Sequence, residues 1–434
     1  MIRTTAAVVF SSVFVLFLCS GCSAGKAPVQ STYHEGITWE ELHARDEARI
    51  SYFINDEAVS TNEVELMKHS VSPSTKPAPI ASGRQTLRSS NYVVRASFGT
   101  PPQSLLMAVD VGNDASWVPC SACVGCPSSA NPFDFKTSST FGSVYCNNPL
   151  CNQVYGSSCK DGNTCSFSMS YGGSRFTAGL SVDTLQIGGD DIPAYAFGCI
   201  NEITGGNKNI PPQGLLGLGR GRASLVSQTK STYGSTFSYC LPSYKSPSFS
   251  GSFLLGRYGQ PRVRKHTALL TNPRRSSLYY VQLIKIKVGH RIVKNIPKTA
   301  FQFDPTTGGG TIIDSGTTYT RLVAPAYTAV RDEFIRQVGG NVTSLGGFDT
   351  CFVNPTNIPV ITLKFRGMGM VLPEENTVIR SSYGGVVCLA MASAPNNVNS
   401  VLNIIGNMQQ QNYRVIFDVM KSRLGVVRET CTVL

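Results

Sequence analysis

The chain has few charged residues, few tryptophans and no apolar run long enough to cross a membrane. Charged residues make up 15% of its 434 residues, and only two residues are tryptophan. The longest apolar run, "AAVVFSSVFVLFLCS" near the N-terminus, is shorter than the roughly 20 residues of a membrane helix. Low charge together with 41 glycines and 24 prolines favours many short strands and turns over long helices.

Several functional signatures are also missing. The five histidines show no metal-ligand spacing, and the glycine-rich "GLGRG" at 217–221 is not followed by the Lys-Ser/Thr of a nucleotide-binding loop. The net charge is +12, but no basic run suits nucleic acid. We therefore expect no metal, no cofactor and no nucleic-acid partner.

The N-terminus has the pattern of a secretory signal peptide. Arg3 precedes the apolar run, and the small residues "GCSAG" follow it, which predicts a signal peptide over residues 1–24. Of the 14 cysteines, Cys19 and Cys22 fall in this segment, and twelve remain. An even number in a secreted chain indicates about six disulfides. The cluster "CSACVGC" suits zinc in a cytosolic protein, but cystines are expected behind a signal peptide.

An acidic segment precedes the rest of the chain. Residues 25–79 carry a net charge of −4, whereas the residues that follow carry +15. "WEELHARDEARISYFINDEA" has helical periodicity over 38–58, and "SVSPSTKPAPIASGRQ" resembles an exposed linker. Residues 25–80 are therefore predicted to be a propeptide, with processing between Lys76 and Gly83. A disordered extension is the alternative.

From residue 91 onward the pattern is mostly β. Segments such as "YVVRASFG", "SLLMAVDVG" and "YRVIFDV" alternate or run apolar and end at turn residues. One helix is predicted over 324–338. Asn341-Val342-Thr343 is the one sequon identified, which predicts N-glycosylation at Asn341.

A two-part unit occurs twice. "AVDVG" at 108–112 is followed by Leu-Leu-Gly at 215–217, and "IIDSGTT" at 312–318 is followed by Ile-Ile-Gly at 404–406. A single Asp-x-Gly is common turn chemistry and leaves a plain turn aspartate as the alternative. The repetition of the whole unit in the same order favours a functional pair, Asp110 and Asp314.

Two such aspartates can hydrolyse a bond if they meet across a pseudo-twofold axis. Like charges a few ångströms apart raise one pKa, so the pair holds one proton between them. The ionised carboxylate can then accept a proton from water while the protonated one polarises a peptide carbonyl. This is general acid–base hydrolysis without a covalent intermediate.

The chain resembles the pepsin-like aspartic proteases, specifically the secreted plant nepenthesin-like and nucellin-like branch with its atypical apoplastic members. The resemblance rests on these motifs: Asp110-Val111-Gly112, Asp314-Ser315-Gly316-Thr317, "SYGGS" at 170–174, "GLLGLGRG" at 214–221 and "NIIGN" at 403–407. It implies a mostly β, bilobal fold with a central cleft between two pseudo-twofold-related lobes. The first lobe would span 91–255, with a cysteine-rich insert, and the second 270–434.

The resemblance also implies roles for individual residues. Asp110 and Asp314 would be catalytic, and Tyr171 and Gly172 would form a flap over substrate, although "SYGG" alone also suits an ordinary strand and turn. The residues expected to support the dyad are Val111, Gly112, Asn113, Ser315, Gly316 and Thr317. Two of them depart from the family pattern. Val111 lacks a hydroxyl, which is expected to leave Ser315 without its partner, and Asn113 replaces a serine that donates to the first carboxylate.

Six disulfides are implied by the family's pairing. They are Cys120–Cys123, Cys126–Cys199, Cys146–Cys165, Cys151–Cys159, Cys240–Cys431 and Cys351–Cys388.

The implied function is that of a secreted aspartic endopeptidase, made as a zymogen and active at acidic pH. Its partners would be polypeptide substrates and its own propeptide, and it would act as a monomer in the apoplast or cell wall. The acidic leader would cover the cleft at neutral pH and leave when its carboxylates are protonated. The alternative is a catalytically weak or inactive protease-fold binding or inhibitor protein of the extracellular space.

Overall fold

The computed structural model describes residues 38–52, 76–127, 131–159, 163–205, 210–246, 248–381, 385–397 and 399–432. All of them belong to one compact unit formed by residues 31–434. The predicted signal peptide, and the leader apart from residues 38–52 and 76–80, lie outside the described residues. None of the helices in the described ranges is both long and apolar enough to span a membrane.

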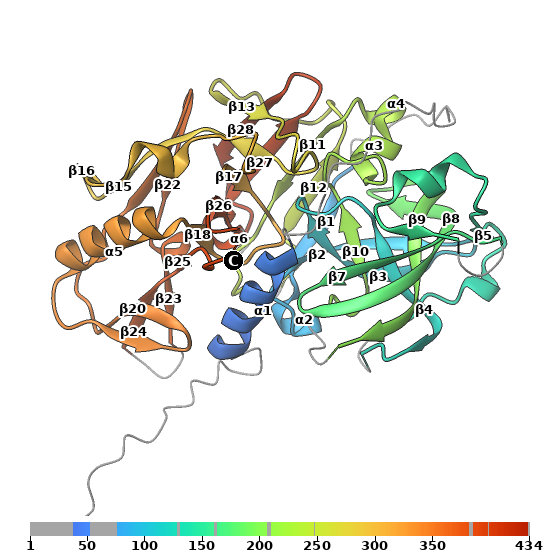
Figure 1. Cartoon of the computed structure of the whole chain (residues 1–434), viewed down its shortest axis with the longest axis horizontal. Coiled ribbons are helices and arrows are strands. Elements are labelled where there is room, and N and C mark those ends of the chain that lie inside the picture. Colours follow the sequence, from blue (N-terminus) through green and yellow to red (C-terminus); the bar gives the residue numbers. More distant parts are fainter. Residues whose placement is uncertain are drawn as a thin grey trace, which may run out of the picture. The chain divides into compact units, whose positions relative to one another are not determined.

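The N-terminal lobe is built from mostly antiparallel strands around an apolar core that includes Phe98, Met107 and Phe197 (Figure 1). Its strands are β1 (Ala78–Ser82), β2 (Tyr92–Phe98), β3 (Gln103–Asp110), β4 (Trp117–Val124), β5 (Gly142–Ser143), β6 (Ser157–Ser158), β7 (Ser166–Tyr171), β8 (Ser174–Ile187), β9 (Asp190–Thr204), β10 (Leu215–Gly217), β11 (Thr236–Cys240) and β12 (Gly251–Leu255). The long β8–β9 hairpin and the β2–β3 hairpin form most of this lobe.

The C-terminal lobe repeats the arrangement and adds two four-stranded sheets, β16-β15-β21-β22 and β19-β20-β24-β23. Its strands are β13 (His266–Leu270), β14 (Tyr280–Val281), β15 (Leu283–Val288), β16 (Arg291–Ile292), β17 (Gly310–Ile313), β18 (Thr320–Leu322), β19 (Thr343–Leu345), β20 (Phe348–Val353), β21 (Ile361–Phe365), β22 (Met368–Leu372), β23 (Val378–Arg380), β24 (Val386–Leu389), β25 (Met391–Ser393), β26 (Leu402–Ile405), β27 (Tyr413–Asp418) and β28 (Arg423–Arg428). The mostly β, two-lobed architecture expected from the sequence is confirmed.

Helices are short, with two exceptions. They are α1 (Trp39–Tyr52), α2 (Gly83–Leu87), α3 (Leu225–Gln228), α4 (Lys230–Tyr233), α5 (Ala324–Val338) and α6 (Asn407–Gln410), with 3₁₀ turns η1 (Phe135–Thr137), η2 (Pro149–Gln153), η3 (Lys298–Phe301) and η4 (Glu374–Asn376). Helix α5 has the predicted bounds and buries Tyr327, Val330 and Phe334. These residues recur at helical spacing, so one face of α5 packs on the core.

An antiparallel run of strands joins the two lobes. Strand β1 pairs with β12, β12 with β11, β11 with β27, β27 with β28, and β28 with β13. Strands from both lobes therefore share backbone hydrogen bonds, so the segments that carry Asp110 and Asp314 are held on one continuous scaffold.

Strand β1 corrects the predicted linker. Residues 78–82 pair with both β2 and β12, and Ala78, Ile80 and Ala81 are buried. "APIAS" was expected to be exposed because of its proline and serine. However, Pro79 lies opposite Ser252 of β12 and outside the residues that pair with β2, so it is paired on one side only, and the apolar side chains gain burial.

Four of the six predicted disulfides are wrong. The structure pairs Cys120 with Cys199, Cys123 with Cys126, Cys146 with Cys159, and Cys151 with Cys165. Cys120 lies on β4, which runs parallel to β9 with Val118 opposite Cys199, so Cys120 and not Cys126 comes within bonding distance of Cys199. The predicted bonds Cys240–Cys431 and Cys351–Cys388 are formed.

Candidate active site

The two-part repeat builds two matching loops. Strand β10 pairs in parallel with β3, placing Gly217 opposite Asp110, and touches β4 at Trp117. In the other lobe β26 pairs in parallel with β17 and touches β18 at Arg321. Each apolar-apolar-Gly strand thus lies between the two arms of an aspartate loop, and the topology positions both carboxylates in the same way.

The carboxylates are oriented by N–H and hydroxyl donors of their own loops. Gly112 N–H donates to Asp110 Oδ1 at 2.8 Å, and Gly316 N–H donates to Asp314 Oδ1 at 3.1 Å. The Thr317 hydroxyl donates to Asp314 Oδ2 at 2.6 Å. A Cβ at position 316 would lie 2.6 Å from the Asp110 carboxylate, so only glycine allows the second loop to approach the first aspartate.

Ser315 is not left without a partner, contrary to the sequence-based expectation. Its hydroxyl donates to the carbonyl of Val109 at 2.8 Å and accepts the N–H of Val111 at 3.1 Å. Both partners are backbone groups of the opposite loop, so they do not depend on the side chain at position 111. Val111 itself is fully buried in the apolar core of its lobe.

Asn113 was expected to stand in for a serine that donates to the first carboxylate, and the structure differs from this expectation. The oxygens of Asp110 are bound by Gly112, Tyr171 and Arg49 rather than by the Asn113 amide. Asn113 is buried, and its carbonyl accepts the N–H of Gly219 at 2.7 Å. Its backbone therefore ties the first loop to the segment that follows β10.

Tyr171 lies at the tip of a hairpin that reaches the dyad. It ends β7, and Gly172 and Gly173, with φ of 57° and 80°, make the turn into β8. The Tyr171 hydroxyl donates to Asp110 Oδ2 at 3.2 Å and receives the Asn91 amide at 3.3 Å. Its ring packs edge-on against Trp117, with centroids 5.6 Å apart. The hairpin thus carries its tyrosine directly onto the Asp110 carboxylate.

Arg49 of helix α1 occupies the site between the aspartates. Its Nη2 lies 2.8 Å from Asp110 Oδ1 and 3.6 Å from Asp314 Oδ2, and its guanidinium stacks over the Tyr171 ring at 5.0 Å. Both aspartates are fully buried, and Arg49 is nearly so. Since one nitrogen contacts both carboxylates, the structure brings Asp110 and Asp314 together at one point.

The burial of the dyad changes its protonation. Burial raises the pKa of Asp110 to about 6, and the neighbouring Asp314 adds to the increase, whereas Arg49, the Gly112 N–H and the Tyr171 hydroxyl lower it. A carboxylic acid with a pKa of about 6 exchanges its proton in mildly acidic solution. This is the condition for acid–base chemistry by a carboxylate pair.

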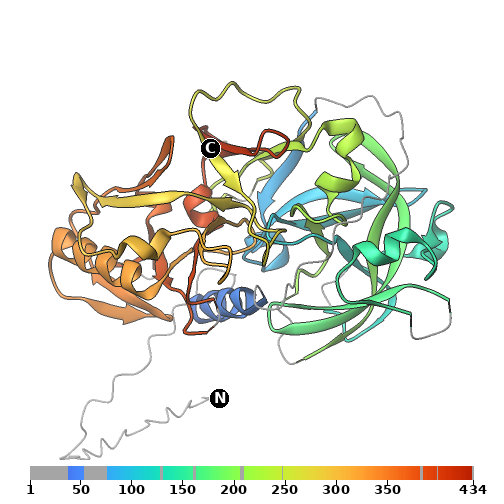
Figure 2. The same cartoon turned by 45° about the horizontal axis from the view of Figure 1, so that its top comes forward.

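Helix α1 is anchored next to the dyad by acidic residues of the leader. The Asp46 carboxylate accepts the N–H of Thr318 at 2.6 Å and the Nε–H of Arg321 at 2.8 Å, and Glu47 also pairs with Arg321. Burial raises the pKa of Asp46, although Arg321 opposes this increase. Figures 1 and 2 show α1 lying between the two lobes.

Two further contacts hold the helix. His43 Nδ1 is hydrogen-bonded to the Tyr319 hydroxyl at 2.6 Å, and burial, followed by the charge of Arg321, lowers the pKa of His43. Ile50 is fully buried among Leu278, Tyr280 and other residues of the C-terminal lobe. The helix is therefore held by both polar and apolar contacts.

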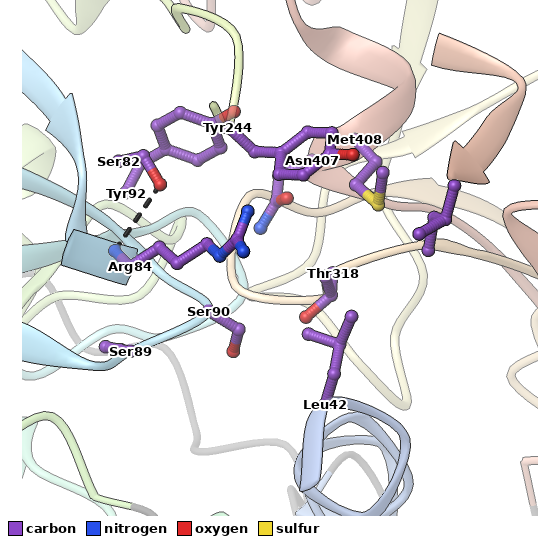
Figure 3. Close-up of a pocket in the computed structure, with 11 residues that line it drawn as sticks. Leu42, Ser82, Arg84, Ser89, Ser90, Tyr92, Tyr244, Thr318, Asn407 and Met408 are labelled. Carbon is purple, nitrogen blue, oxygen red and sulfur yellow. Dashed lines mark hydrogen bonds between the residues drawn. The ribbon is translucent and has the colours of Figure 1, made fainter. Parts of the chain in front are cut away.

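A pocket beside α1 extends the site (Figure 3). Leu42 of α1 borders it, together with Arg84 and Tyr92 of the first lobe and Thr318 and Met408 of the second. Because both lobes and the leader helix line it, this space continues the groove in which α1 lies.

Sequence reasoning did not identify Arg49, Asp46 or Arg321. Arg321 carried a signal, since it is a charged residue in the strand segment "TYTRL" and a buried charge needs a partner. Arg49 lies in a segment whose net charge is negative, and the charge pattern does not single it out. Arg321 meets Asp46 across 275 residues of sequence, and Arg49 meets Asp110 across 61.

Comparison with known proteins agrees with this geometry. Residues 92–257 match the family described as "Xylanase inhibitor N-terminal", and residues 278–427 match "Xylanase inhibitor C-terminal". Aspartyl protease 25 of Oryza sativa subsp. japonica is 48% identical over 82% of this chain and 84% of its own length. Aspartyl protease AED3 of Arabidopsis thaliana is 50% identical over 83% and 81%, and aspartic proteinase nepenthesin-1 of Nepenthes gracilis is 35% identical over 78% of each.

Among solved structures, edgp aligns with a TM-score of 0.67 at 23% identity, covering 84% of this chain and 97% of that one. Basic 7S globulin from soybean aligns with a TM-score of 0.64 at 20% identity, covering 82% and 96%. These two similarities show the shared fold. With the family matches and the curated relatives, they establish that the chain belongs to the pepsin-like aspartic proteases of plants.

Proposed function

We propose that the chain is the precursor of a secreted aspartic endopeptidase that hydrolyses polypeptides with Asp110 and Asp314. The observation that carries the proposal is that Arg49 Nη2 contacts both buried carboxylates. A water molecule at that position would hydrogen-bond to Asp110 Oδ1 and would need to move only slightly toward Asp314 Oδ2, 3.6 Å away, to bind both aspartates. That is the position required for the nucleophile of a two-carboxylate hydrolase.

In the proposed mechanism the pair shares one proton when the leader is absent. The ionised carboxylate removes a proton from the water, whose oxygen attacks the peptide carbonyl carbon. The protonated carboxylate donates its proton to the carbonyl oxygen, giving a neutral tetrahedral diol. Collapse of the diol then transfers a proton to the leaving nitrogen. The proton belongs to the pair, so no separate acid and base are assigned within it.

The leader is proposed to keep the precursor inactive. Arg49 takes the place of the water, and α1 lies where an extended substrate would pass both loops. The charge of Arg49 favours the ionised dyad, whereas hydrolysis requires the pair to keep one proton. The leader thus opposes catalysis by position and by charge. Because β1 is part of the main sheet, we expect processing N-terminal to Ala78.

Acid is proposed to release the leader through the dyad and His43. Burial raises the pKa of Asp110 and Arg49 lowers it. With Asp110 still buried by its own lobe, losing Arg49 favours proton uptake, so low pH favours the open form on this account. The pKa of His43 is lowered in the closed form, so acidification below its ordinary value also favours release. Asp46 acts in the opposite direction because its pKa is raised when α1 is bound. In this proposal the dyad and His43 favour release and Asp46 opposes it, while release by protonation of the other leader carboxylates stays a prediction.

Secretion, the apoplastic location, a monomeric state and N-glycosylation belong to the same proposal. Six disulfides suit an oxidising compartment. Asn341 is exposed in the turn after α5, where a glycan would meet solvent.

The test is cleavage of an unfolded protein by the acid-treated full-length chain, from neutral to strongly acidic pH, with and without pepstatin. We expect pepstatin-sensitive cleavage at acidic pH. Asp110→Asn and Asp314→Asn should each abolish it, because an amide cannot share the dyad's proton.

An extracellular binding or inhibitor protein is the second candidate. The two families that the chain matches are described as xylanase inhibitors, and this favours the second candidate. A chain that cleaves nothing at any acidic pH but binds and inhibits a xylanase would support this candidate over the protease.

A further inference from the structure

The two aspartate loops differ at the position seven residues after the aspartate, which is Trp117 in the first lobe and Arg321 in the second. Each of these residues touches the strand beneath its loop at the equivalent position, Leu215 or Ile404. In the first lobe this position packs against the flap tyrosine. In the second lobe it holds a guanidinium. The position therefore borders the groove in both lobes, but only the second carries a charge.

Arg321 is almost fully buried, and its ion pairs within the described residues are both with the leader. Its side chain is 1% exposed; Asp46, which receives Nε, is fully buried, whereas Glu47 is 38% exposed. Its other partners are neutral, namely the Tyr319 hydroxyl at 2.8 Å and the Ser393 carbonyl at 3.2 Å. Removal of the leader thus leaves a protonated arginine at the groove without a carboxylate partner.

We propose that Arg321 is a specificity-determining residue that binds an acidic side chain of the substrate. The inference rests on the proposed endopeptidase function and specifies its substrate class. Asp46 shows how such an acidic side chain would bind, since its carboxylate accepts hydrogen bonds from both the Thr318 N–H and the Arg321 guanidinium. A substrate aspartate or glutamate can satisfy the same two donors, whereas an apolar side chain leaves the buried charge unpaired.

The spacing along α1 indicates where that acidic residue lies. Asp46 precedes Arg49, which marks the dyad, by three residues, a rise of about 4.5 Å in a helix. An extended substrate advances about 3.3 Å per residue. The acidic side chain is therefore expected within about three residues of the cleaved bond.

The experiment compares matched peptides with the acid-activated wild-type chain. A neutral peptide is varied one position at a time around the cleaved bond, with Asp and with Asn at each position. We expect Asp to raise kcat/KM roughly tenfold over Asn at one position, as one charge-assisted hydrogen bond would. The preference should be present at about pH 5 and fade at about pH 3, where the peptide carboxylate is protonated.

Arg321→Gln should abolish the Asp-over-Asn preference while the neutral peptide is still cleaved, and Arg321→Lys should retain part of it. Arg414→Gln is the matched control, because Arg414 is also buried and paired with an acid, Glu429, but on β27. It should leave the preference unchanged.

Three outcomes are decisive. Cleavage of neutral and acidic peptides at equal rates by the wild-type chain overturns this inference and leaves the proposed function intact. A preference that survives Arg321→Gln also overturns it. Absence of any cleavage overturns the proposed function and this inference with it. The wild-type comparison requires no variant, so a folding defect in Arg321→Gln does not affect it.

Discussion

Arg49 Nη2 lies 2.8 Å from Asp110 Oδ1, so a basic residue of an acidic helix binds a catalytic-loop carboxylate. The acidic residues next to it in the helix, Asp46 and Glu47, bind Arg321 instead. The leader therefore contributes a cation to one ion pair with the lobes and anions to others. Its negative net charge alone does not explain how it binds.

Replacing Arg49 by methionine should activate the precursor at neutral pH. Methionine keeps much of the side-chain volume but removes the charge that binds both carboxylates. One charge-assisted hydrogen bond corresponds to a roughly ten- to hundredfold change in the closed-to-open ratio. We expect peptide cleavage by intact Arg49→Met at pH 7 to rise by a factor in that range over the wild-type precursor.

Arg45→Gln is the control for this prediction. Arg45 lies on the same helix, and its guanidinium donates to the carbonyl of Arg88 at 2.7 Å rather than to the dyad. It removes the same charge from the leader. If Arg45→Gln activates the precursor as strongly as Arg49→Met, the effect comes from weakened helix binding and not from the dyad.

His43→Gln should make activation require stronger acid. Glutamine can keep a hydrogen bond to the Tyr319 hydroxyl but cannot become charged. The pKa of His43 is lowered in the closed form by burial and then by Arg321, while Glu47, Asp46 and Asp349 oppose this shift. Removing the histidine removes a proton-linked contribution to opening that operates below its ordinary pKa, about 6.5.

The measurement is the pH midpoint of precursor processing, followed by gel over time. We expect a decrease on the order of half a pH unit. His266→Gln serves as the control, because the pKa of His266 is also lowered but the residue lies on β13, away from α1. An unchanged midpoint in His43→Gln would assign acid sensing to the dyad alone.

Ser315→Ala should reduce kcat by roughly tenfold or more. The change removes the hydroxyl that binds Val109 and Val111 across the lobes and leaves two buried backbone groups unpaired, each costing about 1–3 kcal/mol. Part of this lost free energy is expected to appear as poorer placement of the two loops and a higher reaction barrier. An increase of about 1.4 kcal/mol in the barrier lowers the rate tenfold.

Ser315→Thr retains the hydroxyl and should restore kcat, measured on one neutral peptide. Val111→Thr should have little effect on kcat, since the Ser315 hydroxyl already has two backbone partners in the opposite loop. Equal kcat for Ser315→Ala and wild type would show that the cross-lobe bonds do not position the dyad.

The cysteine-rich insert offers a chemical test of the fold. Non-reducing peptide mapping should recover Cys146 linked to Cys159 and Cys151 linked to Cys165. Recovery of Cys146–Cys165 instead would restore the pairing implied by the family resemblance.

The sequence alone was sufficient for the architecture of the aspartate loops. Periodicity predicted the strands around Asp110 and helix α5, because apolar residues recur at the spacing of the structure they form. The repeated Asp-x-Gly and apolar-apolar-Gly units predicted two equivalent loops, and the β3–β10 and β17–β26 pairings have that arrangement. These features depend on local chemistry, which a sequence displays directly.

Only the tertiary structure decided the contacts that cross between segments. Cys120 pairs with Cys199 because β4 runs beside β9, and nothing in the spacing "CSACVGC" distinguishes Cys120 from Cys126. Ser315 finds its partners on the backbone of the other loop, and backbone donors and acceptors occur at every residue except proline, so no side-chain motif marks them. Arg49 reaches Asp110 because a helix places residues three and four apart on one face, and which groove that face enters is set by packing.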